Sequence, residues 1–268
     1  MTRSFSDATV MISGAAGGLG RALARSFGRT GSRVVLLDRD AAAVRAVAEE
    51  LAASGTEAIA LPCDVTDETA CADVVAQGVE RFGRLDVLVN NAGITHRSPF
   101  AATQTDVLRR VMEVNLFGAI HLTRAALPHL KLTRGLIVAL SSVAGFTPLI
   151  ARTGYSASKH AMHGFFESLR AELAPDDVGV MMVCPSFIAT GIDRNALGPT
   201  GGTATHAQVV VGRRLQPDDV ADRIVRGAER GRRLLLIGST ARAAWWVSRI
   251  APGLYERVMA RKLRGEMR

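Results

Sequence analysis

Two side chains that can exchange protons, Tyr155 and Lys159, stand four residues apart in the segment YSASK. Residues four apart share one face of a helix, so the phenol and the ammonium can meet in one site. A phenol ionises near pH ~10, and a neighbouring cation lowers that pKa towards neutrality. The pair alone also fits an ordinary surface helix. Ser142, thirteen residues upstream and just past an apolar run, adds a hydroxyl and favours a proton-transfer site.

A glycine-rich loop, SGAAGGLG at residues 13–20, lies between a strand-like run and a helical stretch. Gly14 permits a tight turn, Gly18 lets the backbone approach a pyrophosphate, and Gly20 allows helix and strand to pack closely. The helix N-terminus then presents unpaired N–H groups to the phosphates. The loop therefore predicts a dinucleotide site, with a merely flexible turn as the alternative.

Asp38 ends the second strand-like run, eighteen residues after Gly20. A carboxylate at this position can hold the adenine-ribose hydroxyls and would repel a 2′-phosphate, which favours NAD over NADP. NADP stays open because Arg39 could accept that phosphate. Helix capping is the other role for Asp38, but Asp40 is better placed for it.

Apolar runs and amphipathic stretches alternate along the chain, and the runs read as strands buried on both faces. The expected strands are residues 9–13, 33–38, 58–62, 85–90, 135–141, 179–184 and 234–237; the expected helices are 18–30, 40–54, 67–82, 105–130, 155–173 and 217–231. This pattern predicts an α/β fold, a single-domain Rossmann-like doubly wound parallel sheet of about seven strands with helices on both faces. The domain spans residues 1–238, with an irregular lid over about residues 186–216.

Composition limits the other classes of function. Of 268 residues, 48% are hydrophobic, which suffices for one sizeable core. The three cysteines, Cys63, Cys71 and Cys184, have no CxxC spacing, so we expect no metal site and no disulfide framework. The net charge of +8 gathers near the C-terminus rather than in a groove with interleaved aromatics, so we expect no nucleic-acid partner. Without a signal peptide or an apolar span, a cytoplasmic location is expected.

Residues 239–268 form a basic, amphipathic extension with seven cationic residues against Glu256 and Glu266. Leu254, Val258 and Met259 make an apolar stripe at helical spacing. Such a helix can lie in an anionic membrane interface, so peripheral membrane contact is one interpretation. Packing on the protein's own core or on a partner subunit is the other, and the sequence leaves both open.

Together these motifs resemble the short-chain dehydrogenase/reductase family over roughly residues 8–238. Asn90-Asn91-Ala92-Gly93 is similar to the family's NNAG motif, and Asp64-Val65 to its adenine-contacting pair. Ser13 replaces the family's Thr before the glycine loop, and Ser186 replaces the Gly that usually follows Pro185. The resemblance implies a Ser142, Tyr155, Lys159 and Asn115 catalytic set. It also implies a homodimer or homotetramer.

In such a family Tyr155 is the general acid–base, Ser142 positions the substrate oxygen, and Lys159 lowers the tyrosine pKa and holds the nicotinamide ribose. Asn115 kinks its helix and supports a proton-relaying water. The cofactor residues implied by the motifs and their resemblance are Gly14, Gly17, Gly18, Leu19, Gly20, Asp38, Arg39, Asp64, Val65, Asn91, Ala92, Gly93, Tyr155, Lys159, Pro185, Ile188 and Thr190.

The expected substrate pocket is apolar. Its residues are Ile94, His96, Ser142, Val143, Leu149, Tyr155, Phe187 and Ile188, with His96 as a specificity residue. We therefore expect an NAD-dependent oxidoreductase for a bulky hydrophobic secondary alcohol or ketone, such as a steroid, retinoid or lipid-like alcohol. One alternative is an NADPH-dependent carbonyl reductase. Another, of a different class, is a catalytically silent regulator that senses the nucleotide.

Overall fold

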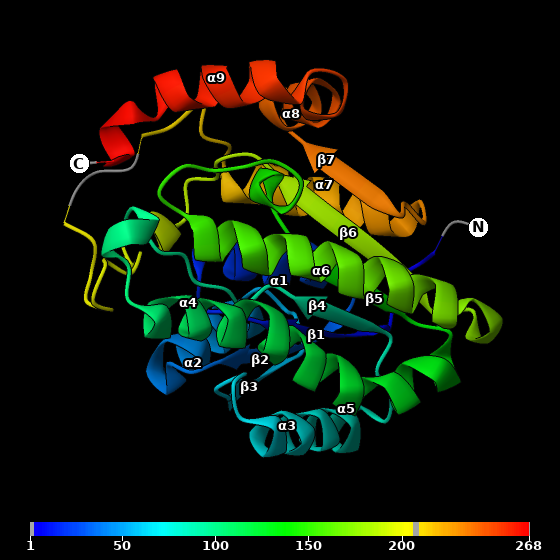
Figure 1. Cartoon of the computed structure of the whole chain (residues 1–268). Coiled ribbons are helices and arrows are strands. Elements are labelled where there is room, and N and C mark those ends of the chain that lie inside the picture. The colour runs from blue at the N-terminus through cyan, green and yellow to red at the C-terminus, as the bar shows by residue number, and fades with distance from the viewer. Residues whose placement is uncertain (1–2, 206–208, 268) are drawn as a thin grey trace.

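A computed structural model describes residues 3–205 and 209–267. Their strands form one parallel sheet in the order β3-β2-β1-β4-β5-β6-β7 (Figure 1). The strands are β1 (Thr9–Ser13), β2 (Arg33–Asp38), β3 (Ala58–Pro62), β4 (Val87–Asn90), β5 (Leu136–Leu140), β6 (Gly179–Pro185) and β7 (Leu234–Ile237). The predicted doubly wound α/β fold is confirmed.

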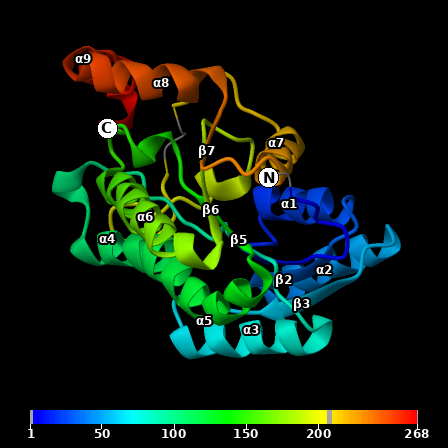
Figure 2. The same cartoon turned by 90° about the vertical axis from the view of Figure 1, so that its right-hand side faces the viewer.

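Helices cover both faces of this sheet, as Figure 2 shows. The α-helices of the described residues are α1 (Gly18–Gly28), α2 (Ala41–Ala53), α3 (Glu68–Phe82), α4 (Thr105–Met112), α5 (Gly118–Thr133), α6 (Thr153–Glu172), α7 (Pro217–Glu229), α8 (Ser239–Ile250) and α9 (Pro252–Lys262). One core joins the sheet to α1, α2 and α7 around Leu23 and Phe27. The other joins it to α3, α5 and α6 around Leu122 and Phe166. Strands without a polar face are therefore buried from both sides.

The strand order reverses between β1 and β4, which pair directly with each other. The loops after these two strands diverge to opposite faces, and a crevice opens at their carboxyl ends. The glycine loop follows β1, and Asn91 follows β4. The topology thus brings both motifs to one edge of the sheet.

The predicted long helix over residues 105–130 is wrong in one respect. It is two α-helices, α4 and α5, joined by a single π turn at Glu113–Phe117. The extra residue in a π turn shifts the faces of the helix relative to each other. Asn115 lies inside this turn, so its direction differs from that in a regular helix.

The lid segment after β6 is irregular but held at several points. Isolated bridges join Leu197 to His96 and Thr203, and Leu215 to Ile188. Gly191–Asp193 forms one short 3-10 turn. Residues 206–208, within the predicted lid, lie outside the described residues.

Helices α8 and α9 lie together at one end of the molecule (Figures 1 and 2). Their buried side chains Ala244, Tyr255, Met259 and Leu263 pack against Val143, Phe146, Leu149, Ile150, Val209 and Val211. Pro252 starts α9 and ends the run of α8, because it cannot continue a helix. In the described part of the chain, no helix is long and apolar enough to cross a membrane.

Candidate active site

A cavity of about 1400 Å³ opens at the carboxyl ends of the strands. It runs from the glycine loop, past Tyr155, to an apolar chamber beneath α8 and α9. Of the predicted site residues it is lined by Gly14, Gly17, Leu19, Gly20, Asp38, Arg39, Asp64, Val65, Asn91, Ala92, Gly93, Ile94, Ser142, Val143, Leu149, Tyr155, Lys159, Pro185, Phe187, Ile188 and Thr190. Nearly all of the predicted set therefore meets at one cavity.

The glycine loop needs its glycines for two different reasons. Gly14 has φ +65°, and a Cβ there would lie 2.9 Å from Cα of Ala92. A Cβ on Gly20 would come 2.1 Å from the carbonyl oxygen of Gly14. The first turn of α1 carries no acidic residue, so its positive dipole end remains available to an anion.

Ser13 fixes the glycine loop to the motif after β4. Its Oγ accepts hydrogen bonds from the N–H groups of Asn91 and Ala92, each at 3.1 Å. The Asn91 side chain returns two bonds, donating to the carbonyls of Ser13 at 2.9 Å and Gly14 at 3.0 Å. A serine hydroxyl thus holds the two loops together at the position where threonine was expected.

Acidic groups line the other end of this cleft. Asp38 accepts from the N–H of Ala16 at 3.1 Å and from that of Asp40 at 3.2 Å. It therefore ties down the glycine loop, while Asp40 caps α2 as expected. The hydrogen bond from the Thr66 N–H lowers the pKa of Asp64, and the Arg39 cation adds to this. These carboxylates suit the hydroxyl groups of a ribose.

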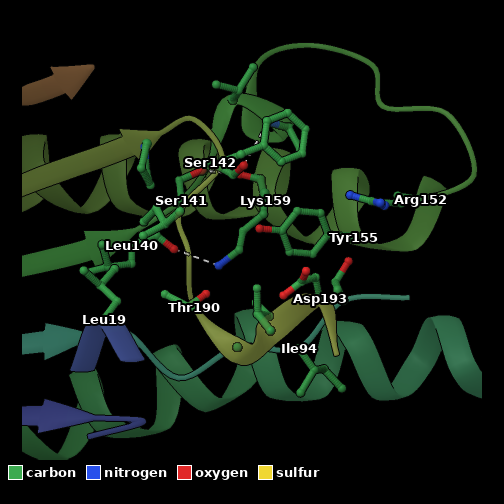
Figure 3. A pocket seen from close by; sticks show the side chains of 18 of the residues that line it. Leu19, Ile94, Leu140, Ser141, Ser142, Arg152, Tyr155, Lys159, Thr190 and Asp193 are labelled. Atoms are coloured by element: carbon green, nitrogen blue, oxygen red, sulfur yellow. Dashed lines mark hydrogen bonds between the residues drawn. The ribbon is translucent and has the colours of Figure 1, made fainter. Parts of the chain in front are cut away.

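The three proton-transfer residues meet where the cleft joins the apolar chamber (Figure 3). Ser142 follows β5, caps the next short turn through the N–H of Ala144 at 3.2 Å, and its hydroxyl acts to lower the pKa of Tyr155. Lys159 Nζ donates to the carbonyl of Leu140 at 2.7 Å and lies 5.9 Å from the centre of the Tyr155 ring. One helix turn brings phenol and ammonium to the same wall, as their spacing predicts.

Burial dominates the electrostatics of this pair. It raises the pKa of Tyr155, against the opposing effects of the Ser142 hydrogen bond and the Arg152 cation. It also lowers the pKa of Lys159 to about 8. The expectation of a lowered tyrosine pKa is not met in this structure, because desolvation of the phenolate outweighs the nearby charges.

Asn115 is fully buried and does not line the cavity. Its Oδ1 accepts from the Ile94 N–H at 2.8 Å, and its Nδ2 donates to the Ile94 carbonyl and to Ser158 Oγ, both at 2.9 Å. A Cβ on Gly93 would lie 3.2 Å from Asn115 Oδ1 and 3.7 Å from Lys159 Nζ. Asn115 thus fixes the loop after β4 against α6, directly beside the lysine.

Comparison with known proteins agrees with this geometry. The sequence model of a family described as short chain dehydrogenase matches residues 8–198. The chain belongs to the short-chain dehydrogenase family. A bovine protein named dehydrogenase/reductase SDR family member 7B is 37% identical over 268 residues, covering 97% of this chain and 82% of the relative. The protein is therefore an oxidoreductase of the dehydrogenase/reductase type.

Two solved short-chain dehydrogenases share the fold. One from Burkholderia phymatum, in complex with NAD, superposes with a TM-score of 0.84 at 26% identity over 94% of this chain and 96% of that one. One from Streptomyces avermitilis gives 0.80 at 29% identity, over 97% and 99%. The match extends over nearly the whole length of each chain.

Besides Asn115, two predicted residues do not line the cavity of this short-chain dehydrogenase. His96, the expected specificity residue, is fully buried and does not line the cavity, and its Nε2 accepts from the Gly154 N–H at 2.9 Å. Burial lowers its pKa to about 4, so the ring stays a neutral acceptor. Gly18 is likewise not a lining residue, although a Cβ on it would lie 3.3 Å from Cα of Thr190, which does line the cavity.

The departure from the family pattern at Ser186 causes no backbone strain. Its φ is not positive, and its N–H donates to the carbonyl of Ile237 at 3.0 Å. The accommodating residue is Gly238 instead, with φ +102°, where a Cβ would lie 2.6 Å from Ser186 Oγ. The Ser186 hydroxyl therefore fits because the residue that faces it, Gly238, has no side chain.

Several cavity residues were missed from the sequence. They come from the loop after β4 and the residue before α6 (Thr95 and Arg152), from the lid (Asp193, Leu197 and Val211), and from the last two helices (Val247, Leu254, Tyr255, Val258 and Met259). The apolar stripe of α9 was visible in the sequence as a helical repeat. The residues against which this stripe packs could not be predicted, because a helical repeat shows that one face is apolar but not which segment lies against that face.

Proposed function

We propose that this short-chain dehydrogenase interconverts a bulky, hydrophobic secondary alcohol and its ketone with NAD as the hydride carrier. The observation that supports this most directly is the position of Tyr155, Ser142 and Lys159 together at the junction of a nucleotide cleft and an apolar chamber. A carbonyl oxygen at this junction would meet both hydroxyl groups. Transfer of deuterium from labelled NADH to a hydrophobic ketone tests the proposal.

The residues of the cleft fit a nicotinamide dinucleotide. The glycine loop leaves no room for a Cβ at Gly20, α1 offers its N-terminus without an acid, and Asp38 lines the far end. Lys159 and Thr190 line the nearer end, where they would hold the nicotinamide ribose and carboxamide. When bound, the nicotinamide ring supplies or accepts the hydride. The Asp38 carboxylate favours NAD over NADP, because it would repel the 2′-phosphate on the adenine ribose of NADP.

Tyr155 is suited to give a proton to the substrate oxygen during reduction. Its raised pKa keeps the phenol protonated at neutral pH, the form that can donate. Oxidation requires the phenolate and is therefore favoured as pH rises. Ser142 would orient the substrate oxygen, and below pH ~8 the Lys159 ammonium beside it would stabilise negative charge on Tyr155.

The chamber beyond Tyr155 favours an apolar substrate. Its walls are supplied by Ile94, Val143, Leu149, Phe187, Val211, Leu254, Val258 and Met259. Burying a ligand against so many aliphatic groups removes apolar area from water, which is worth about 25 cal/mol per Å². A steroid-, retinoid- or lipid-like alcohol has that surface.

We also propose peripheral contact with an anionic membrane through α8 and α9. Four apolar side chains there are strongly exposed: Trp246 (63%), Ile250 (77%), Leu254 (52%) and Val258 (42%). The cations Arg242, Arg249, Arg257, Arg261, Lys262 and Arg264 are exposed on the same two helices and the turn after them. Leu254, Val258 and Lys262 also line the cavity, so its mouth opens on this surface. An apolar substrate could then enter from the bilayer.

Replacing Ile250 and Leu254 together with aspartate is expected to abolish co-sedimentation with anionic phosphatidylserine vesicles, since two charges would enter the apolar interface. Wild type should bind anionic vesicles and bind neutral phosphatidylcholine vesicles weakly. Leu132→Asp is the matched control, because Leu132 is 85% exposed on α5. Equal sedimentation of wild type and the double variant would rule out this surface.

Assembly into a homodimer or homotetramer is proposed from the family resemblance. Exposed Phe117, at 41%, and partly buried Phe165 and Leu169 leave apolar area on the helix layer of α5 and α6. Such area commonly pairs between identical subunits. Sedimentation equilibrium gives the mass, and a monomer at micromolar concentration would contradict the proposal.

A further inference from the structure

A charged residue near the C-terminus is buried in this protein. Glu266 is 1% exposed and lies in the short 3-10 turn Arg264–Met267 that follows α9. Glutamate is rarely buried to this degree unless it is paired, because an isolated carboxylate loses much solvation energy. Its partners therefore show what holds the end of the chain in place.

Glu266 joins three segments that are far apart in sequence. Its Oε1 lies 3.1 Å from Arg152 Nη2 and accepts the Val209 N–H at 2.6 Å. Its Oε2 lies 3.9 Å from Nε of Arg97. Both arginines are buried, at 4% and 3% exposure. One carboxylate thus links the C-terminal turn, the lid, the segment before α6 and the loop after β4.

One of these partners, Arg152, lines the cavity, and the other two contact residues that line it. Arg152 stands three residues before Tyr155, at the start of α6 (Figure 3). Val209 packs in the cluster formed with α8 and α9. The Arg97 guanidinium donates to the carbonyl of Asp193 at 2.6 Å, and Asp193 lines the cavity from the lid side. Replacing Glu266 should therefore affect two walls of the substrate chamber, the one that carries Arg152 and the lid side that carries Asp193.

The two buried cations, Arg97 and Arg152, need the Glu266 carboxylate to balance their charge. Burial lowers the pKa of Arg152, the Glu266 carboxylate opposes this, and the Arg97 cation adds to the lowering. Removing one partner of a buried ion cluster leaves an uncompensated charge, which the protein relieves by moving the side chain or admitting water. Among the described residues, Glu266 is the carboxylate paired with Arg152, so its loss removes the ion pair that holds this side chain in the cavity wall.

We propose that Glu266 is a positioning residue of the active site, which holds Arg152 beside Tyr155 and fixes the lid through Val209. The C-terminus thus completes the substrate chamber rather than merely covering it. The kinetic part of this inference rests on the proposed oxidoreductase function, whereas its structural part does not.

The test compares full-length wild type with Glu266→Gln, Arg152→Gln and the double variant. Glu256→Gln is the matched control, since it removes one negative charge from an exposed position on α9. For reduction of the best ketone among 2-undecanone, a 3-ketosteroid and a 17-ketosteroid, Glu266→Gln should lower kcat/KM about tenfold while KM for NADH stays within about twofold. In the Arg152→Gln background the same change should cost less than about twofold, because coupled residues are not additive.

A second readout is independent of turnover. Hydrogen exchange in the peptide containing Val209 should be about tenfold faster in Glu266→Gln than in wild type or Glu256→Gln. Unchanged exchange, or an equal loss of kcat/KM in both backgrounds, overturns the proposal. If wild type reduces no ketone, the proposed function fails and the exchange result alone decides the positioning role. Should Glu266→Gln not fold, Glu266→Asp, which keeps the charge but shortens the reach, takes its place in both measurements.

Discussion

Replacing Tyr155 with phenylalanine is expected to lower kcat by about 10³-fold or more, while the Kd for NADH stays within about twofold. The substitution removes only the hydroxyl and leaves the ring in the cavity wall. Proton transfer to the substrate oxygen then has no donor at that position. Steady-state kinetics with a hydrophobic ketone and fluorescence titration with NADH measure the two quantities separately.

Tyr255→Phe is the matched control for this experiment. Tyr255 is the other tyrosine of the chain, lines the same cavity, and donates its hydroxyl to Thr147 Oγ1 at 3.0 Å. Losing a neutral hydrogen bond there should cost at most about tenfold in kcat/KM. If Tyr155→Phe keeps more than a few per cent of wild-type turnover, Tyr155 is not the proton donor.

Asp38→Asn should shift cofactor preference towards NADP by about tenfold to hundredfold in the ratio of kcat/KM values. The carboxylate would face a 2′-phosphate, and removing its charge removes that repulsion. Asparagine keeps an oxygen that can accept from the Ala16 N–H, so the glycine loop retains its anchor. Arg39, which lines the cavity beside Asp38, is then available to the phosphate.

Asp40→Asn is the control for general effects of charge at this edge, because Asp40 caps α2 through the N–H groups of Ala42 and Ala43. Asp40→Asn should leave the ratio of the kcat/KM values for NAD and NADP unchanged within about twofold. A wild-type protein that already works better with NADP than with NAD would contradict the role given to Asp38.

The strands were largely predictable from sequence, because each is a short apolar run bounded by polar or glycine residues. β1, β2, β3 and β7 begin and end where predicted. The hydrophobic pattern did not show the break between α4 and α5, although the family resemblance implied a kink at Asn115, which lies in the π turn. A π turn inserts a single residue into an otherwise continuous helical repeat, and the periodicity of residues 105–130 tolerates that insertion.

The site was predictable to the extent that it depends on local spacing. Tyr155 and Lys159 share a helix face whatever surrounds them, and the glycine loop needs only its own backbone conformation. Burial was not predictable, and it reverses the direction of the tyrosine pKa shift. His96 and Glu266 show the same limit, since only tertiary contacts reveal that the first is a buried acceptor and the second a buried anion.

Transfer of deuterium from NADH labelled at C4 of the nicotinamide ring tests the central claim most directly. The two C4-labelled epimers of NADH are each incubated with wild type and a panel of hydrophobic ketones, and the alcohol products are analysed by mass spectrometry. We predict that one epimer, with wild type, gives an alcohol carrying deuterium on the carbinol carbon, and that Tyr155→Phe gives essentially none. Binding of NADH without deuterated alcohol from any ketone of the panel would contradict the account.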